Sequence, residues 1–189
     1  MKELKNPSEF FLAERAENAA GSAITVMREG ARNFLIEIQA LTVKTNFGQP
    51  RRTSHGLDLS KFHLLLAVVS KFTPFRCEDF DAYLNVVSGM KAKEPAVDLA
   101  VVAAVLSSRA EKEIPADTVI LGEVGLSGEI RSVAHLQSRL TEAEKLGFTK
   151  AIVSRIRNKQ QLPKKMKVIE VKSVQELVKA VFEGLKIDE

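Results

Sequence analysis

The side chains best able to do chemistry are few and far apart in this sequence. The three histidines, His55, His63 and His135, lack the spacing of metal ligands. His63 falls in an apolar stretch with helical periodicity, where we expect a partly buried, hydrogen-bonded histidine, whereas His55 lies in a polar stretch and could face a partner. Cys77 is the only cysteine, which excludes a disulfide or a cysteine-based metal site within this chain, and we expect it to be inert.

The common motifs for nucleotide binding and hydrolysis are absent from the sequence. There is no GxxxxGK[ST] motif, so the chain has no P-loop to hold a triphosphate, and neither GxSxG nor HExxH occurs. The segment GEVGLSGEI has glycine spacing, but it lies between predicted strands instead of opening a helix, which argues against a dinucleotide site. We therefore expect no cofactor in this chain.

A first basic stretch is a candidate contact for nucleic acid. Pro50 stiffens a predicted loop that presents Arg51 and Arg52, and two guanidinium groups suit bidentate contact with phosphate. Further candidates for the same surface are Lys44, Lys91 and Lys93. If this loop binds DNA, replacing Arg51 and Arg52 by alanine should lower DNA affinity without lowering the melting temperature.

A second basic stretch, from residue 150 to 167, holds seven basic residues and no acidic one. Its basic residues are Lys150, Arg155, Arg157, Lys159, Lys164, Lys165 and Lys167. Neither stretch carries interleaved aromatic residues for base stacking, so any contact would be with the phosphate backbone and would weaken as salt rises. The alternative is that both stretches are solvated faces that keep the domain soluble.

Strands and helices alternate along the chain. We expect a strand pair over residues 22–27 and 34–41, a loop over 46–56, a helix over 59–72, a strand over 83–88, a helix over 95–108, two strands within 118–133, a helix over 135–147, short strands at 151–153 and 167–171, and a last helix opening at 173. Asp58 and Ser173 are the predicted caps of two of these helices. This order predicts an α/β domain of two or three layers.

Composition limits the class of protein further. With 189 residues, 45% of them hydrophobic, the chain suits one globular domain plus a terminal arm, in which Phe10, Phe11 and Leu12 are apolar among charges. No apolar run reaches the roughly 18 residues that span a bilayer, and we see no secretory signal, so we expect a cytoplasmic protein without a membrane contact. The net charge of +4 permits contact with nucleic acid but does not demand it.

Four blocks of the sequence resemble the bacterial RadA (Sms) family, in that family's order. They are NPSEFFLAERAENAAGSA, EIQALTVKTNFGQPRRTSHGLD, LNVVSGMKAKEPAVDLAVVAAVLSS and LGEVGLSGEIRSVAHLQSRLTEAEKLGFTKAIV. This region corresponds to the family's carboxy-terminal domain, which is similar to the proteolytic domain of Lon protease. The resemblance implies a Lon-like α/β fold with a mixed sheet over residues 21–189, preceded over residues 1–20 by an arm from an ATPase domain outside this chain.

The same resemblance implies where a Lon-type serine–lysine dyad would stand. The serine position, just after a proline at the start of a helix, falls on Ala96 after Pro95, and the lysine position falls on Gln137. Alanine has no hydroxyl to form an acyl-enzyme, and an amide cannot take a proton from a nucleophile. We therefore expect a protease-like domain without catalysis. Asp98 has a local explanation, because a carboxylate complements a helix amino terminus, although a subunit contact is an alternative.

RadA proteins are ATP-dependent and act in recombinational DNA repair by promoting branch migration, so the resemblance implies single-stranded or branched DNA as a partner. It also implies a hexameric ring, with RecA as a partner of the full-length protein, and it places ATP, Mg and Zn in amino-terminal regions outside this chain. Two alternatives stay open. One is a Lon-like peptidase with a displaced nucleophile at Ser88, Ser107 or Ser127, and the other is a pure oligomerisation module without DNA contact.

Overall fold

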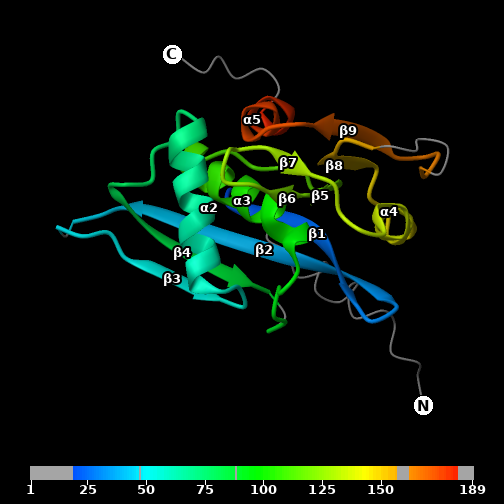
Figure 1. The fold of residues 1–189 in the computed structure, drawn as a ribbon, viewed down its shortest axis with the longest axis horizontal. Helices are drawn as coiled ribbons and strands as arrows, with labels where there is room; N and C mark the ends of the chain where they lie inside the picture. Colours follow the sequence, from blue (N-terminus) through cyan, green and yellow to red (C-terminus); the bar gives the residue numbers. More distant parts are fainter. Residues whose placement is uncertain (1–18, 47, 88, 157–161, 183–189) are drawn as a thin grey trace.

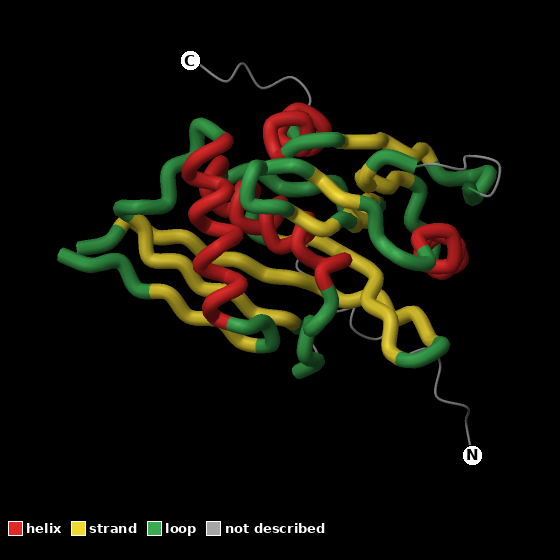
Figure 2. The backbone as a smooth tube through the Cα atoms, in the orientation of Figure 1, coloured by secondary structure: helices red, strands yellow, loops and turns green. Residues whose placement is uncertain are grey.

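The computed structural model describes residues 19–46, 48–87, 89–156 and 162–182. They form a seven-stranded mixed sheet in the order β3-β4-β2-β1-β5-β8-β9, packed against helices, and a separate ribbon, β6-β7 (Figure 1; Figure 2). The strands are β1 (Ser22–Glu29), β2 (Arg32–Lys44), β3 (Arg52–His55), β4 (Phe80–Val86), β5 (Thr118–Leu121), β6 (Glu123–Val124), β7 (Ile130–Arg131), β8 (Lys150–Ser154) and β9 (Lys167–Val171). The helices are α2 (Leu59–Phe72), the single 3-10 turn η1 (Pro95–Val97), α3 (Asp98–Ala110), α4 (Leu136–Lys145) and α5 (Val174–Val181). The predicted α/β fold with a mixed sheet is confirmed.

Two apolar clusters lie on opposite faces of the sheet. Side chains alternate between the two faces along β1, so Ala23 lies in one cluster and Ile24 in the other, as expected for a strand buried on both faces. Helices α2, α3 and α5 cover the first face, while α4 contributes Leu140 and Ala143 to the second (Figure 1). The second cluster draws on β1, β5 and β8, so no described helix covers β3, β4 and the end of β2 on that face.

Local signals account for most helix ends. Asp58 caps α2 by accepting a hydrogen bond from the Lys61 N–H at 2.9 Å, and Ser173 caps α5 by accepting one from the Glu176 N–H at 3.3 Å. The Glu176 carboxylate accepts in turn from the Lys172 N–H, one residue before the position of the standard capping box. Gly147 follows α4 with a φ of 92°, which ends that helix as predicted.

Three sequence predictions need correction. The predicted loop over residues 46–56 contains strand β3, because Arg52–His55 pairs in parallel with β4, a contact between segments about 30 positions apart. His63 is exposed on α2 instead of partly buried. The segment 118–133 makes three strands, since β5 joins the main sheet while β6 and β7 form the separate ribbon.

Gly122, between β5 and β6, shows why the chain turns there. A Cβ at this position would lie 2.9 Å from Ile130 Cγ2 and 3.0 Å from Leu99 Cδ2. The Gly122 N–H donates to the Ala96 carbonyl, and the Gly122 carbonyl accepts from the Leu99 N–H, both at 3.0 Å. A residue without a side chain therefore lets the end of β5 lie against the start of α3.

Among the described residues, no helix is long and apolar enough to cross a membrane.

Candidate functional site

Ala96 lies where the carboxyl end of β5 meets the start of α3. It belongs to η1, its side chain is 4% exposed, and its carbonyl accepts the hydrogen bond from Gly122. Gln137, the other predicted dyad position, is exposed in the first turn of α4. A buried methyl group and an exposed amide supply neither a nucleophile nor a base.

A buried ion pair joins the segments that carry these two positions. The Arg139 guanidinium binds both Glu94 carboxylate oxygens at 2.7 Å and also donates to the Val26 carbonyl at 2.7 Å. The Arg139 side chain is 3% exposed, and Glu94 also accepts from the Arg28 N–H. Burial by itself would raise the pKa of Glu94, but the hydrogen bonds from Arg139 and Arg28 outweigh it and hold this pKa below its ordinary value.

A second ion pair lies at the amino terminus of α3. Lys61 Nζ is 2.7 Å from a carboxylate oxygen of Asp98, which is 1% exposed and also accepts from the Val124 N–H at 3.3 Å. Burial raises the pKa of Asp98, and Lys61 offsets only part of that rise. Asp98 is thus more than a complement to the helix amino terminus, because its carboxylate joins α2, α3 and β6.

A cleft of about 520 Å³ opens beside this pair. Its walls come from the segment after β3, the start of α2, the segment before η1, and Asp98; they are residues 56–58, Lys61, residues 91–95 and Asp98. The cleft lies at the carboxyl ends of the parallel strands β3 and β4, the edge where open α/β sheets bind ligands. Each of its three carboxylates already has a partner described above, whereas Lys91 and Lys93 are exposed at its rim.

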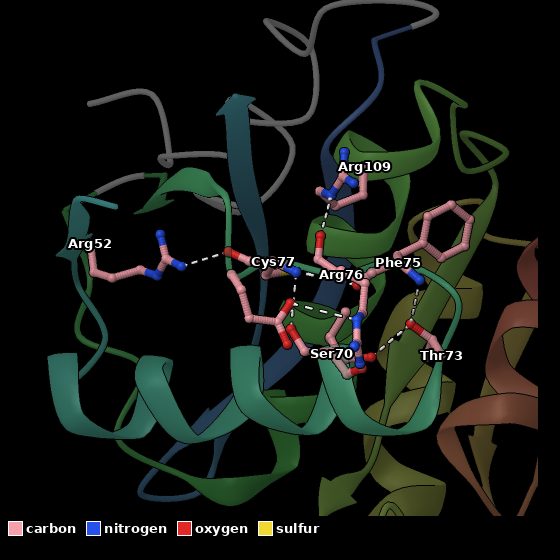
Figure 3. Close-up of polar contacts among 9 residues, drawn as sticks. Arg52, Ser70, Thr73, Phe75, Arg76, Cys77 and Arg109 are labelled. Atoms are coloured by element: carbon pink, nitrogen blue, oxygen red, sulfur yellow. Dashed lines mark hydrogen bonds and ion pairs between the residues drawn. The ribbon is translucent and has the colours of Figure 1, made fainter. Parts of the chain in front are cut away.

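The opposite ends of β3 and β4 carry a second group of cations. We define the basic corner as Lys44, Arg51, Arg52, Arg76 and Arg109. Phe80 lies at its centre: Lys44 pairs with it across the sheet, and the Arg109 guanidinium lies 3.4 Å from the centre of its ring. The Arg109 side chain also donates to the Arg76 carbonyl at 3.0 Å (Figure 3).

The predicted arrangement of the Arg51–Arg52 stretch is corrected by these contacts. Arg52 does not present its guanidinium from a loop; it lies in β3 and donates to the Phe80 carbonyl and, at 2.6 Å, to the Cys77 carbonyl (Figure 3). Arg51 is exposed, and its N–H donates to Asp81. Removing Arg52 should therefore lower stability, contrary to the expectation from sequence.

The five cations predicted to share one surface fall into two groups. Lys44 lies with Arg51 and Arg52 at the start of β3, whereas Lys91 and Lys93 follow β4 at the other end of the strand pair. Four residue steps from Arg52 to Gly56 separate these ends by roughly 13 Å at 3.3 Å per residue. The separation follows from the parallel pairing of β3 with β4, which a loop prediction did not include.

The second basic stretch is also divided by the sheet. Lys150 and Lys167 pair across β8 and β9 at one end of these strands, while Arg155 follows β8 at the other end. Lys164 and Lys165 are exposed before β9, and the Lys165 N–H donates to Glu144. Arg157 and Lys159 lie outside the described residues.

Cys77 is buried, as the expectation of an inert thiol requires, and burial raises its pKa. The Cys77 N–H donates a hydrogen bond to Ser70 Oγ at 3.0 Å (Figure 3). Within the described residues, no group of three His, Cys, Asp or Glu side chains could hold a metal ion.

The chain is 44% identical over 183 residues to a protein of Streptococcus pyogenes, and 44% identical over 186 residues to one of Bacillus subtilis. A relative in Aquifex aeolicus is 42% identical over 182 residues. Each is named DNA repair protein RadA, and the alignments cover 95% to 97% of this chain. The chain is a homologue of bacterial RadA. It spans 40% of the length of these RadA relatives, so it matches one part of them.

A family model described as subunit ChlI of Mg-chelatase matches residues 66–157. This range runs from within α2 through β8 and contains both Ala96 and Gln137. The similarity to RadA is broader, because it also includes most of the residues on either side of that range.

Sequence reasoning missed the two ion pairs. Asp98 gave a partial signal, since a carboxylate in an almost wholly apolar helix needs a buried partner, but nothing local pointed to Lys61. Glu94 and Arg139 are 45 positions apart, and neither stands in a motif.

Proposed function

We propose that this chain is the non-catalytic, Lon-like scaffold and DNA-contact part of a RadA-type, ATP-dependent DNA repair protein that acts in homologous recombination and branch migration. The observation that carries the proposal is the similarity of 42% to 44%, over almost all of the chain, to proteins named for DNA repair. ATP, Mg and Zn would bind parts of such a protein outside this chain. Contacts with RecA would need the full-length protein.

Lack of peptidase activity is supported by the surroundings of the alternative nucleophiles. Ser107 is fully buried, and its hydroxyl accepts from the Gly21 N–H and donates to the Lys112 carbonyl. Ser127 lines a groove with Lys61, but the Lys61 ammonium lies 2.7 Å from Asp98, and a protonated amine cannot accept a proton from a hydroxyl. Ser88 lies outside the described residues.

We expect no turnover when the protein is incubated with casein and with a fluorogenic peptide. The physical reason is that neither Ala96 nor Gln137 can take part in acyl transfer. Turnover that a serine-reactive inhibitor abolishes would instead support the peptidase with a displaced nucleophile.

DNA contact is best supported at the basic corner. Three of its cations meet at Phe80: Lys44 pairs with it across the sheet, Arg52 donates to its carbonyl, and the Arg109 guanidinium lies over its ring. Hydrogen bonds to backbone carbonyls hold the guanidinium groups of Arg52 and Arg109 in fixed positions. Guanidinium groups that are already ordered lose little entropy when they bind phosphate. Glu78, Asp79 and Asp81 lie in the same region and reduce its charge, which favours contact with a few phosphates over wrapping of a duplex.

Replacing Lys44 and Arg51 by alanine should weaken binding to single-stranded or branched DNA at every sequence. Each lost phosphate contact should reduce the slope of log K against log salt by about 1, so the double variant should lose about 2. Fluorescence anisotropy over a salt series measures this slope. The matched control is Lys145→Ala with Lys179→Ala, which removes two exposed lysines from α4 and α5.

Equal slopes for the wild type and for the Lys44→Ala, Arg51→Ala variant would refute contact at the basic corner. The same series with Lys91→Ala and Lys93→Ala tests the rim of the cleft. A pure oligomerisation module would form rings in light scattering and show no salt-dependent DNA binding with any variant, which separates it from the proposed function.

A further inference from the structure

One half of a sheet face has no cover among the described residues. On the second face, α4 packs over β1, β5 and β8, but β3, β4 and the end of β2 present their side chains outward. Leu41 and Val43 on this face are 57% and 48% exposed, and Tyr83 lies beside Leu41 on the neighbouring strand. Large apolar side chains grouped on one surface indicate an interaction site.

This face is hollowed into a groove of about 540 Å³, which we call the open groove. It runs across the strands from Gly21 past Gln39 and Leu41 of β2 and Tyr83 of β4 to His55 of β3. Three strand spacings separate β1 from β3, which is roughly 14 Å at 4.8 Å each. A groove of this length suits a short helix or an extended segment.

The described part of the chain begins at the mouth of this groove. Ala19 and Ala20 line it, and Gly21 is fixed to β2 because the Ala40 N–H donates to the Gly21 carbonyl at 2.7 Å. The preceding 18 residues are therefore joined to the described part of the chain at this groove. Leu12 precedes Ala19 by seven residues, a reach of roughly 10 Å in a helix and up to roughly 23 Å extended.

Those 18 residues include apolar side chains that could cover Leu41 and Tyr83. Phe10, Phe11 and Leu12 are consecutive, with charged residues on either side. Two phenylalanines bring a large apolar area, and neither has a polar atom that needs a partner. The length, the point of attachment and the composition of the segment thus agree with the size and position of the groove and with Leu41 and Tyr83 in its lining.

We propose that the segment containing Phe10, Phe11 and Leu12 docks in the open groove against Leu41 and Tyr83. The segment then forms the cover of the second sheet face where α4 is absent. In a longer protein, this docking fixes where the preceding part of the chain meets the domain, because the segment crosses from β1 toward β3 before it leaves. This docking requires no contact with DNA.

Tryptophan fluorescence tests this docking directly. The chain contains no tryptophan, so Phe10→Trp and Phe11→Trp each create a single reporter in the full chain. We expect at least one reporter to emit at shorter wavelength than free tryptophan, because docking against Leu41 and Tyr83 would shield its ring from water. Adding Leu41→Asp should move that emission to the wavelength of free tryptophan. The matched control is Leu126→Asp, at a leucine 69% exposed on the β6-β7 turn, which should leave the emission unchanged.

Each other outcome overturns the proposal. Solvent-like emission from both reporters means that the segment does not dock, and a blue shift that survives Leu41→Asp places it on another surface. A shift that disappears on dilution shows that a second copy supplies the contact. Circular dichroism of the Leu41→Asp variant checks that the domain is folded, which we expect because Leu41 is not part of either core cluster.

Discussion

The guanidinium of Arg52 donates to the carbonyls of Phe80 and Cys77, so this residue holds the loop before β4 against β3. Its neighbour Arg51 is exposed, and the two arginines therefore have different roles although they are adjacent in a basic stretch. Both are candidates for DNA contact, and the guanidinium contacts of Arg52 also make it part of the fold. A double substitution would mix the two effects, so each residue must be replaced separately.

At this scale we predict that Arg52→Ala lowers the free energy of unfolding by about 1–3 kcal/mol, since two carbonyls lose a charged donor. In a chain of this size that corresponds to a fall in melting temperature of roughly 2–12 °C. Thermal unfolding followed by circular dichroism measures it. Arg76→Ala, whose side chain is 72% exposed, is the control and should stay within about 0.5 kcal/mol of wild type. Equal losses in both variants would contradict the role of Arg52.

Ion pairs between elements position the cleft. Glu94 and Arg139 connect the segment before η1 to α4, and Lys61 and Asp98 connect α2 to α3. These two pairs thus join the elements around Ala96. The stability that each carboxyl group contributes changes with pH in opposite directions, because the pKa of Glu94 is lowered on folding while that of Asp98 is raised.

The sign of each response follows from linkage. Glu94 contributes stability above its ordinary pKa of 4.5, and this contribution is lost as pH falls through the lower folded value. Asp98 contributes most below its ordinary pKa of 3.8 and loses this contribution as pH rises through the higher folded value. As pH falls from 5.5 to 3, the difference in melting temperature between wild type and Glu94→Gln should therefore shrink. The difference between wild type and Asp98→Asn should grow over the same range. Melting temperatures across this range check both, and parallel curves would contradict the assignment.

For the whole molecule, burial is concentrated in the centre. Helix α3 is buried along most of its length between the sheet and helices α2 and α5, whereas β3 and β9 are the sheet edges. We expect hydrogen exchange to be slowest in α3 and β1, near the limit set by global unfolding, and at least tenfold faster in β3 and β9, which open locally. Mass spectrometry of exchanged peptides measures this order. Protection in β3 as strong as in α3 would indicate that another chain covers this edge.

Patterns within a few positions of one another were sufficient for much of this protein. The apolar run from Val97 to Leu106 predicted a helix, and Asp58 and Ser173 predicted the starts of α2 and α5, because periodicity and capping depend on neighbours along the chain. The expectation that Ala96 and Gln137 stand at dyad positions also came from the sequence, through its resemblance to a family, and it stays a prediction.

Only the tertiary structure decided how distant residues meet. It placed Arg52 in an edge strand, separated Lys44 from Lys91 and Lys93, exposed His63, and joined Glu94 to Arg139 across 45 positions. It also left Leu41 exposed in the groove that Ala19 and Ala20 line. The physical reason is that strand pairing and charge pairing are contacts between segments far apart in sequence, and no local pattern specifies which segments will meet.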